Sequence, residues 1–379
     1  MTGRGLISLL FHLVFAGVLL ADKPAVPHID YVEPASAQPA EMDASVIWFD
    51  DFDDGSWKAS YAEKAGDLTD QMRLGSTGKA LHMHYSKGHR GKGGCKVFFG
   101  DSPAYPAKAF RRGETFDDIY WRIYVKHQAG WQGGGPAKLS RATSIAGPNW
   151  SQAMIAHVWS SGESLTLDPA SGIKNDQLVT TRYNDFANLR WLGNRPASRF
   201  KIHATSESGR WVCVEARAKL NTPGEKDGEN QLWIDGKLEA ERRNLDWRGR
   251  FDDKGINAVF LEAYWNDGSP VDQSRWIDHF VISTKPIGPI TAAAKPVIVK
   301  TPYSGPGKQQ AWQVELAKDA SGRESVWTSP VIVHASQFTL PSEILDPGRL
   351  YYLRVRQQSS EGSAWSDWSA WHQPFRSNP

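Results

Sequence analysis

The sequence predicts an all-β protein in which an antiparallel β-sandwich is followed, after a short linker, by a second unit. Between residues 45 and 284, short runs of alternating apolar and polar side chains are separated by Gly, Pro, Asn and Asp, and no long segment has helical periodicity. A proline-rich break at 285–289 ends this pattern, and a second strand-rich segment begins near residue 296. A chain of 379 residues is long enough for two domains. The expected units are residues 45–289 and 296–379.

The clearest strand pair of the first unit is a hairpin within residues 211–235. Val212, Val214 and Ala216 alternate with other residues, and a turn rich in Asn, Pro and Gly follows. The returning strand ends in Asp235-Gly236, a dipeptide that favours a tight turn. The other strand candidates have the same alternation and flanking breakers: residues 46–49, 80–85, 96–99, 119–126, 154–159, 178–183, 257–265 and 276–283.

The N-terminus has the pattern of an export signal. Arg4 precedes an uncharged apolar run over residues 6–21, which is short for a membrane span. Residues 1–21 are therefore expected to be a signal peptide, and the protein to be secreted or periplasmic. Leu19 stands where a small residue is preferred before cleavage, so an uncleaved anchor remains an alternative. Residues 22–44 are rich in Pro and Ala and are expected to be a linker.

Composition restricts the partners of the exported part. The formal net charge is only +2, so the chain lacks the strongly basic field that nucleic-acid binding requires. No second long apolar run follows the first, so no further membrane segment is expected. Cys95 and Cys213 both lie in the exported part, where the compartment permits a disulfide. Sequence does not show whether they pair, nor the oligomeric state.

The hairpin also carries a family resemblance. A W-x-x-x-E strand followed by D-G-x-x-x-x-W-I-D-G-K resembles the concanavalin A-like jelly rolls, in particular the polysaccharide lyases of the alginate and glucuronan lyase type. The resemblance implies a jelly-roll sandwich with a curved groove, a polysaccharide as partner, and cleavage of an acidic, uronate-containing polysaccharide by β-elimination. It implies no cofactor. Asp51 and Asp53, after the first strand, are candidates for a structural calcium site, and no other metal is expected.

A lyase needs cationic groups to neutralise the uronate carboxylate, and a residue such as Tyr or His to move protons. The strand over residues 119–126 offers such side chains on one face, because its apolar residues take the other face. Tyr120, Arg122, Tyr124 and Lys126 are therefore expected to face the groove.

Three further segments resemble lyase motifs. Lys138 follows Trp131 and a glycine run, as in the W-x-x-G-G-K-L-P segment of alginate lyases in which the Lys faces the substrate. His157 lies where another alginate lyase group has a Q-I-H strand, although Ile155 replaces the Gln. Glu262 and Tyr264 share a strand face that resembles the strand carrying the catalytic Tyr, and Glu262 disfavours a uronate substrate unless it pairs with an Arg.

The leading hypothesis is an exported lyase whose catalytic residues are Tyr264, His157, Arg122 and Lys138. Arg122, Lys138 and His157 hold the carboxylate in this hypothesis, and Tyr264 moves the proton. The expected substrate-binding residues are Tyr120, Tyr124, Lys126, Arg141 and Arg182, and only one of Arg182 and Tyr183 is expected to face the groove. A non-catalytic carbohydrate-binding or adhesion protein is the rival hypothesis. The E-x-D-x-E strand common in glycosidases of this architecture is absent from the sequence.

The C-terminal unit, residues 296–379, resembles a fibronectin type III domain. Leu345, Pro347, Gly348 and Tyr351 form the L-x-P-G-x-x-Y pattern, in which the tyrosine makes a corner bond to the backbone. Residues 365–369 form a W-S-x-W-S box, beside which outward-pointing arginines of the preceding strand are expected to stack on tryptophans. This resemblance predicts a seven-stranded sandwich and is silent on function.

Overall fold

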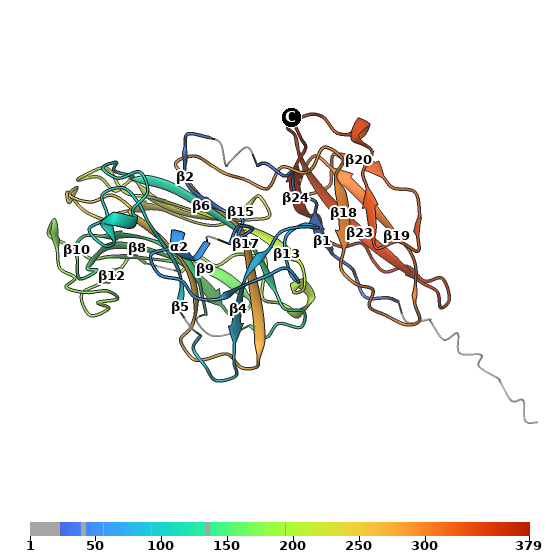
Figure 1. Cartoon of the computed structure of the whole chain (residues 1–379), viewed down its shortest axis with the longest axis horizontal. Coiled ribbons are helices and arrows are strands. Elements are labelled where there is room, and N and C mark those ends of the chain that lie inside the picture. Colours follow the sequence, from blue (N-terminus) through green and yellow to red (C-terminus); the bar gives the residue numbers. More distant parts are fainter. Residues whose placement is uncertain (1–22, 39–42, 56, 92, 134–136, 194) are drawn as a thin grey trace, which may run out of the picture.

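The computed structural model describes residues 23–379 except 39–42, 56, 92, 134–136 and 194. The predicted all-β fold class is confirmed: two β-sandwiches lie side by side, with strands β1 and β24 at their junction (Figure 1). The expected signal peptide lies outside the described residues. Within the described residues, no helix is both long and apolar enough to cross a membrane.

The first sandwich consists of two antiparallel sheets. The six-stranded sheet has the order β12 (Arg190–Trp191), β9 (Ser164–Ser171), β8 (Gln152–Ser161), β7 (Ala137–Ile145), β16 (Ala258–Trp265) and β5 (Gly93–Phe98). The eight-stranded sheet has the order β15 (Lys237–Leu245), β14 (Gly228–Ile234), β13 (Trp211–Lys219), β6 (Asp118–His127), β17 (Gln273–Ser283), β4 (Ala80–Tyr85) and β3 (Asp67–Thr69), with β2 (Val46–Asp50) also paired to β17.

The main hydrophobic core lies between these two sheets. Val212 and Val214 of β13 and Trp121 of β6 are buried in it, as their alternation predicts. The hairpin register is also as expected, because Val214 is paired with Ile234 across β13 and β14. Polar and charged side chains of the same strands therefore point to the outer faces of the sandwich.

Helical structure in the described residues is confined to short pieces, and one strand prediction is wrong. The short pieces are α2 (Trp57–Ser60) and the 3-10 turns Pro106–Lys108, Thr205–Glu207 and Ser342–Ile344. The strand expected over residues 178–183 is limited to β11 (Gln177–Leu178), which pairs only with β10 (Ile173–Lys174). The chain then turns, because Thr181 is held by its backbone and hydroxyl to the Asp185 carboxylate.

The second sandwich takes a strand from the segment expected to be a linker. Its three-stranded sheet has the order β1 (Ile29–Val32), β18 (Val297–Lys300) and β22 (Gln337–Thr339). Its second sheet contains β20 (Ser325–Thr328), β19 (Gln309–Ala317), β23 (Leu350–Ser359) and β24 (His372–Arg376), with β21 (Ile332–Val333) paired to β19. The linker prediction for residues 22–44 is therefore wrong over β1, because Ile29 and Val32 are buried in the second core.

Two local features of the second sandwich agree with the motifs in its sequence. The Tyr351 hydroxyl accepts a hydrogen bond from the Asp346 backbone N–H at 2.7 Å, which is the expected tyrosine corner. The Arg354 guanidinium lies 4.9 Å from the ring centre of Trp368, and Arg356 lies 4.5 Å from that of Trp365. Arg354 is also paired with the Glu315 carboxylate, whereas Arg356 donates to the Gln313 side-chain oxygen at 2.6 Å.

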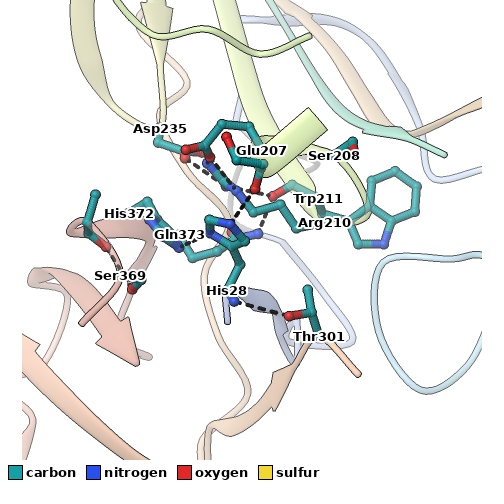
Figure 2. A network of polar contacts seen from close by, with 12 residues as sticks. His28, Glu207, Ser208, Arg210, Trp211, Asp235, Thr301, Ser369, His372 and Gln373 are labelled. Atoms are coloured by element: carbon teal, nitrogen blue, oxygen red, sulfur yellow. Dashed lines mark hydrogen bonds and ion pairs between the residues drawn. The ribbon is translucent and has the colours of Figure 1, made fainter. Parts of the chain in front are cut away.

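A buried polar network joins the two sandwiches (Figure 2). Arg210, next to β13, is fully buried between Glu207 and Asp235, whose carboxylates lie 3.1 and 3.2 Å from its guanidinium. The His28 ring contacts the Ser206 carbonyl oxygen at 2.5 Å and the His372 ring at 3.4 Å. Since these contacts connect β1 and β24 to the first sandwich, the second sandwich is fixed beside the eight-stranded sheet.

The position of β1 gives a stability prediction. Replacing Ile29, whose side chain is 0% exposed, with Asp places a carboxylate in the second core and should lower the unfolding free energy by several kcal/mol, the order expected for an unpaired buried charge. Val26 is 42% exposed, so Val26→Asp is the matched control and should have a small effect. Urea unfolding of both variants measures this. Equal stabilities of the two would show that β1 does not belong to the second core.

A buried histidine gives a pH prediction. Burial, assisted by the nearby Arg275 cation, lowers the pKa of His203 to about 3. Below pH 6.5 the unfolded chain binds a proton that folded His203 does not, so stability is lost as the pH falls toward 3, by about 1.4 kcal/mol per pH unit. Urea unfolding of the parent and His203→Gln at pH 7 and pH 5 should show a weaker pH dependence for the variant. Parallel pH dependences would contradict this prediction.

Candidate functional site

A large cavity lies on the outer face of the six-stranded sheet. It has a volume of about 630 Å³ and crosses the strands from β5 and β16 to β8 and β12. Lys138, His157 and Glu262 reach it from β7, β8 and β16 because their strand neighbours Leu139, Val158 and Leu261 point into the core on the opposite face. The cavity is therefore a groove that runs across the strands, and we call it the outer groove.

Lys138 and Tyr264 form a cross-strand pair in the outer groove. They are register partners on β7 and β16, and the Lys138 ammonium lies 5.1 Å from the centre of the Tyr264 ring. Among the described residues, neither the Lys138 ammonium nor the Tyr264 hydroxyl has a hydrogen-bond partner or an ion-pair partner. Burial lowers the pKa of Lys138, and the Glu262 carboxylate opposes this shift. The groove thus holds a phenol and an amine that are available to a ligand.

Arg141 organises the floor beneath this pair. Its side chain is 0% exposed, and its guanidinium forms an ion pair with Glu262 at 2.8 Å. It also donates hydrogen bonds to the Asn184 side-chain oxygen at 2.9 Å and to the Tyr183 hydroxyl. Burial raises the pKa of Tyr183 to about 12, so this phenol stays protonated. Arg141 was expected to bind substrate; the structure places it in the groove as a buried positioning residue.

His157 is neutral and is poorly placed to act as a general acid or base. Burial, followed by the charges of Arg141, Lys138 and Arg195, lowers its pKa well below the usual value. Arg141 can only donate, so the contact of 3.3 Å makes Nε2 of His157 the acceptor and leaves the ring hydrogen on Nδ1. The Nδ1 atom is itself buried and has no partner among the described residues. A neutral imidazole does not neutralise a carboxylate, so that expected role of His157 is not supported.

Aromatic rings enclose a second lysine at the β5 side of the floor. The Lys96 ammonium is paired with Glu63 and lies 4.7 Å from the centre of the Trp150 ring and 5.3 Å from that of Phe260. The Arg141 guanidinium also lies 5.3 Å from the centre of the Phe260 ring. Because its charge is already balanced, Lys96 contributes to the shape of the groove more than to its net charge.

The β8–β12 end of the groove is aromatic. Parallel rings follow one another: Phe186 and Trp191 at 6.3 Å, Trp191 and His157 at 6.3 Å, and His157 and Trp159 at 5.1 Å. Phe186 is 52% and Trp191 37% exposed, although large aromatic side chains are usually buried. Arg195 covers Trp159 at 5.4 Å. We call Trp159, Trp191 and Phe186 the aromatic end.

Five expected site residues lie elsewhere, four of them on β6. Arg122, Tyr124 and Lys126 do share one face of β6, but that face is the outer side of the eight-stranded sheet. Arg122 donates to the Gly288 carbonyl oxygen at 2.9 Å, Tyr124 accepts from the Ile290 N–H at 3.0 Å, and Lys126 pairs with Asp30 of β1 at 2.8 Å. The linker between the sandwiches and β1 therefore cover these side chains.

Tyr120 lies on the same outer face and packs on Arg217 at 5.2 Å, so it too is far from the groove. Arg182 is exposed on the loop after β11 and does not line the groove, whereas the neighbouring Tyr183 does. The expectation that only one of the two faces the groove is therefore met by Tyr183. The turn that Asp185 stabilises places Tyr183, and not Arg182, in the groove. Strand alternation alone could not predict which of the two would face it.

The structure adds residues that the sequence pattern did not indicate. Arg90, Asn184 and Asn266 line the groove from loops, and the aromatic end comes from β8, β12 and the loop before it. Loop residues have no periodicity, so sequence gave no signal for them. Glu262 was noted only as unfavourable unless paired, and its ion pair with Arg141 satisfies that condition.

The other sequence-based site predictions receive no direct support. The Asp51 carboxylate accepts a hydrogen bond from the Asp53 N–H, as in a tight turn, and the Asp53 carboxylate accepts one from the distant Lys79 N–H. Among the described residues, no group of three acidic, His or Cys side chains is arranged to hold a metal ion. Calcium binding near Asp51 and Asp53 stays a prediction. Cys95 and Cys213 are both free and buried in different clusters, so they do not pair in this structure.

No protein-family model and no curated protein matches this chain. Among solved structures, it is similar to an endo-β-1,4-glucuronan lyase from the fungus Trichoderma reesei, with 12% identity over 68% of this chain and 96% of that chain and a TM-score of 0.40. It is also similar to alginate lyase vAL-1 from a Chlorella virus, with 14% identity over 60% and 94% of the two chains and a TM-score of 0.42. A PL-14 alginate lyase from Aplysia kurodai matches with 14% identity over 68% and 99%, with a TM-score of 0.40. With identities of 12–14% and TM-scores below 0.5, these likenesses assign the chain neither a family nor an activity.

Proposed function

We propose that this protein is an exported polysaccharide lyase that cleaves a uronate-containing polysaccharide by β-elimination in the outer groove. The observation that carries the proposal is the pairing of Lys138 with Tyr264 across β7 and β16, with both polar groups open to a ligand. An amine beside a phenol supplies one group that attracts a carboxylate and one that transfers a proton. Export rests on the apolar run over residues 6–21.

The reaction needs three changes at one sugar residue. The Tyr264 oxygen, as phenolate, takes the proton from C5, and the electron pair left on C5 forms the C4–C5 double bond. The bond between C4 and the glycosidic oxygen breaks, and Tyr264 returns the proton to that oxygen. Lys138 holds the carboxylate and stabilises the negative charge that develops on it as C5 loses its proton. The products are an unsaturated uronate and a shortened chain, with no water consumed.

The charge of the floor is compatible with an anionic ligand. The Glu262 carboxylate is the acidic side chain that most directly lines the groove, and its ion pair with Arg141 offsets its charge. Arg90 lines the same end of the groove, is exposed, and forms no ion pair among the described residues. With Lys138 and Arg90 unpaired, the β16 end of the groove attracts a carboxylate.

A panel of uronate polymers tests this function. We expect at least one polymer to give a time-dependent rise in ultraviolet absorbance, because β-elimination produces a conjugated unsaturated uronate and hydrolysis does not. The parent protein and a Lys138→Met variant should be compared at equal concentrations, with the variant slower. Absence of the chromophore across polyglucuronate, polymannuronate, polyguluronate and alternating glucuronate copolymers would contradict the proposal.

The aromatic end favours a second candidate, a carbohydrate-binding protein without catalysis. Exposed Trp191 and Phe186 suit stacking on sugar rings whether or not a bond is broken. This candidate predicts that polymers slow the protein in an affinity gel while no unsaturated product forms. In that case Trp191→Ala should weaken retention and Tyr264→Phe should leave it unchanged.

A further inference from the structure

The two ends of the outer groove differ in free charge. At the β16 end, Lys138 and Arg90 form no ion pair with a described carboxylate. At the aromatic end, Arg195 packs over the Trp159 ring. Its guanidinium lies 3.2 Å from the Asp168 carboxylate. The Arg195 charge is therefore already balanced. Among the described residues that line the aromatic end, no unpaired cation is available to bind a second carboxylate.

Asp168 also disfavours an anionic ligand at that end. Its side chain is 2% exposed, and it faces His157 as its register partner across β8 and β9. The neighbouring imidazole is neutral, so Arg195 alone compensates the Asp168 charge when that carboxylate is ionised. A uronate carboxylate beside Arg195 competes with Asp168 for the same guanidinium.

The aromatic end suits a sugar that presents an apolar face. Trp191 and Phe186 are stacked at 6.3 Å with an interplanar angle of 17°, and both are substantially exposed. Carbon–hydrogen groups on one side of a hexose ring pack on such aromatic surfaces with no need for charge. The charged β16 end therefore favours an acidic sugar, and the aromatic end favours a non-acidic sugar.

The spacing of the strands lets neighbouring sugars of one polysaccharide chain occupy the two ends of the groove. Lys138 is the register partner of Tyr264 on one side and of Trp159 on the other. Adjacent strands are separated by about 4.8 Å, so a chain that crosses the sheet presents successive residues to successive strands. A uronate at Lys138 and Tyr264 thus has its neighbour over Trp159 and the exposed rings beyond it.

We infer that the outer groove selects a copolymer in which uronate residues are linked to non-acidic sugars, with the uronate at Lys138 and the non-acidic sugar at the aromatic end. This inference deepens the proposed function, on which it rests for the position of the uronate. It distinguishes such copolymers from homopolymers of uronate, which place a carboxylate on every residue. The aromatic end is then a specificity-determining subsite.

Binding measurements test the inference separately from catalysis. Dissociation constants should be measured by calorimetry for an alternating copolymer of glucuronate and N-acetylglucosamine and for polyglucuronate of similar length, at one fixed ionic strength. We expect the copolymer to bind at least about fivefold more tightly, the scale of one aromatic stacking contact. In Trp191→Ala the ratio of the two constants should move toward one. Leu238→Ala, an exposed apolar residue on β15, should leave both constants unchanged.

The outcomes separate the two proposals. Equal affinity for both polymers, or a preference for polyglucuronate, would overturn the inference even if both polymers are cleaved to unsaturated products. A copolymer preference that Trp191→Ala does not reduce would also overturn it, because the aromatic end is its stated cause. A preference that depends on Trp191, without unsaturated product from any polymer of the uronate panel, would support the inference and reject the lyase.

Discussion

Tyr264→Phe is expected to lower turnover by about 10²-fold or more, the usual scale for the loss of a general acid or base. The substitution keeps the ring that packs beside Lys138 and removes only the hydroxyl, which has no hydrogen-bond partner among the described residues. Polymer affinity should change little, so kcat should fall while the dissociation constant stays close to that of the parent. Initial rates of chromophore formation and calorimetric binding measure the two quantities.

A tyrosine outside the groove provides the matched control. Tyr120 lies on the opposite face of the sandwich and packs on Arg217, so Tyr120→Phe should keep the parent turnover. Full activity in Tyr264→Phe would reject the role of Tyr264. His157 is a poor substitute as base, because Nε2 accepts from Arg141 and Nδ1 is buried. Such a result would therefore direct attention to Lys138, whose pKa is lowered by burial.

Arg141→Met is expected to lower the unfolding free energy by about 3–5 kcal/mol, the range for removing one partner of a buried ion pair. The variant leaves the Glu262 carboxylate buried without its partner and removes the donor that holds the Asn184 oxygen. The groove floor also loses the guanidinium between Tyr183 and Phe260. Urea unfolding at pH 7 measures the stability change.

The double variant Arg141→Met with Glu262→Gln separates the lost ion pair from other effects. The neutral amide no longer leaves a buried charge unpaired, so the double variant should be more stable than Arg141→Met alone. A double-mutant cycle should therefore give a coupling energy of at least about 1 kcal/mol between the two residues. Additive losses would show that Arg141 and Glu262 are not coupled in solution.

Alternation along a strand predicted part of the site correctly. Phe260, Glu262 and Tyr264 share the outer face of β16, as the pattern of residues 257–265 indicated, and all three contribute to the groove or its floor. Lys138 reaches the groove despite the longer glycine run before it, because the register of β7 is set by pairing with β16 and β8. Residues 134–136 of that run lie outside the described part of the chain.

The same rule failed on β6 for a physical reason. Alternation correctly separates Trp121 and Ile123, which are in the core, from Arg122 and Tyr124 on the outer face. It does not indicate which of the two outer faces carries the groove, or what covers the other one. Here the cover is the linker and β1, segments distant in sequence, whose contacts no local pattern reveals.

Short elements and loops account for the remaining differences. Strand β1 has only four residues within a segment rich in Pro and Ala, so its pairing with β18 depends on the fold of the second sandwich. Trp191 and Phe186 lie on a two-residue strand and in a loop, where neither periodicity nor a motif marks them. Arg141, by contrast, is on a long strand, and its role as a positioning residue follows only from its buried partners.

Cleavage in heavy-oxygen water with mass analysis of the products tests the central claim most directly, namely that the outer groove breaks a glycosidic bond by elimination. The parent protein should convert a uronate-containing polymer into fragments whose new non-reducing ends are unsaturated, and no solvent oxygen should be incorporated at the cleaved bond. Tyr264→Phe should give the same products much more slowly. Incorporation of heavy oxygen at the new chain ends would show hydrolysis, and an uncleaved polymer that is nevertheless bound would show a binding protein; either result would contradict the account.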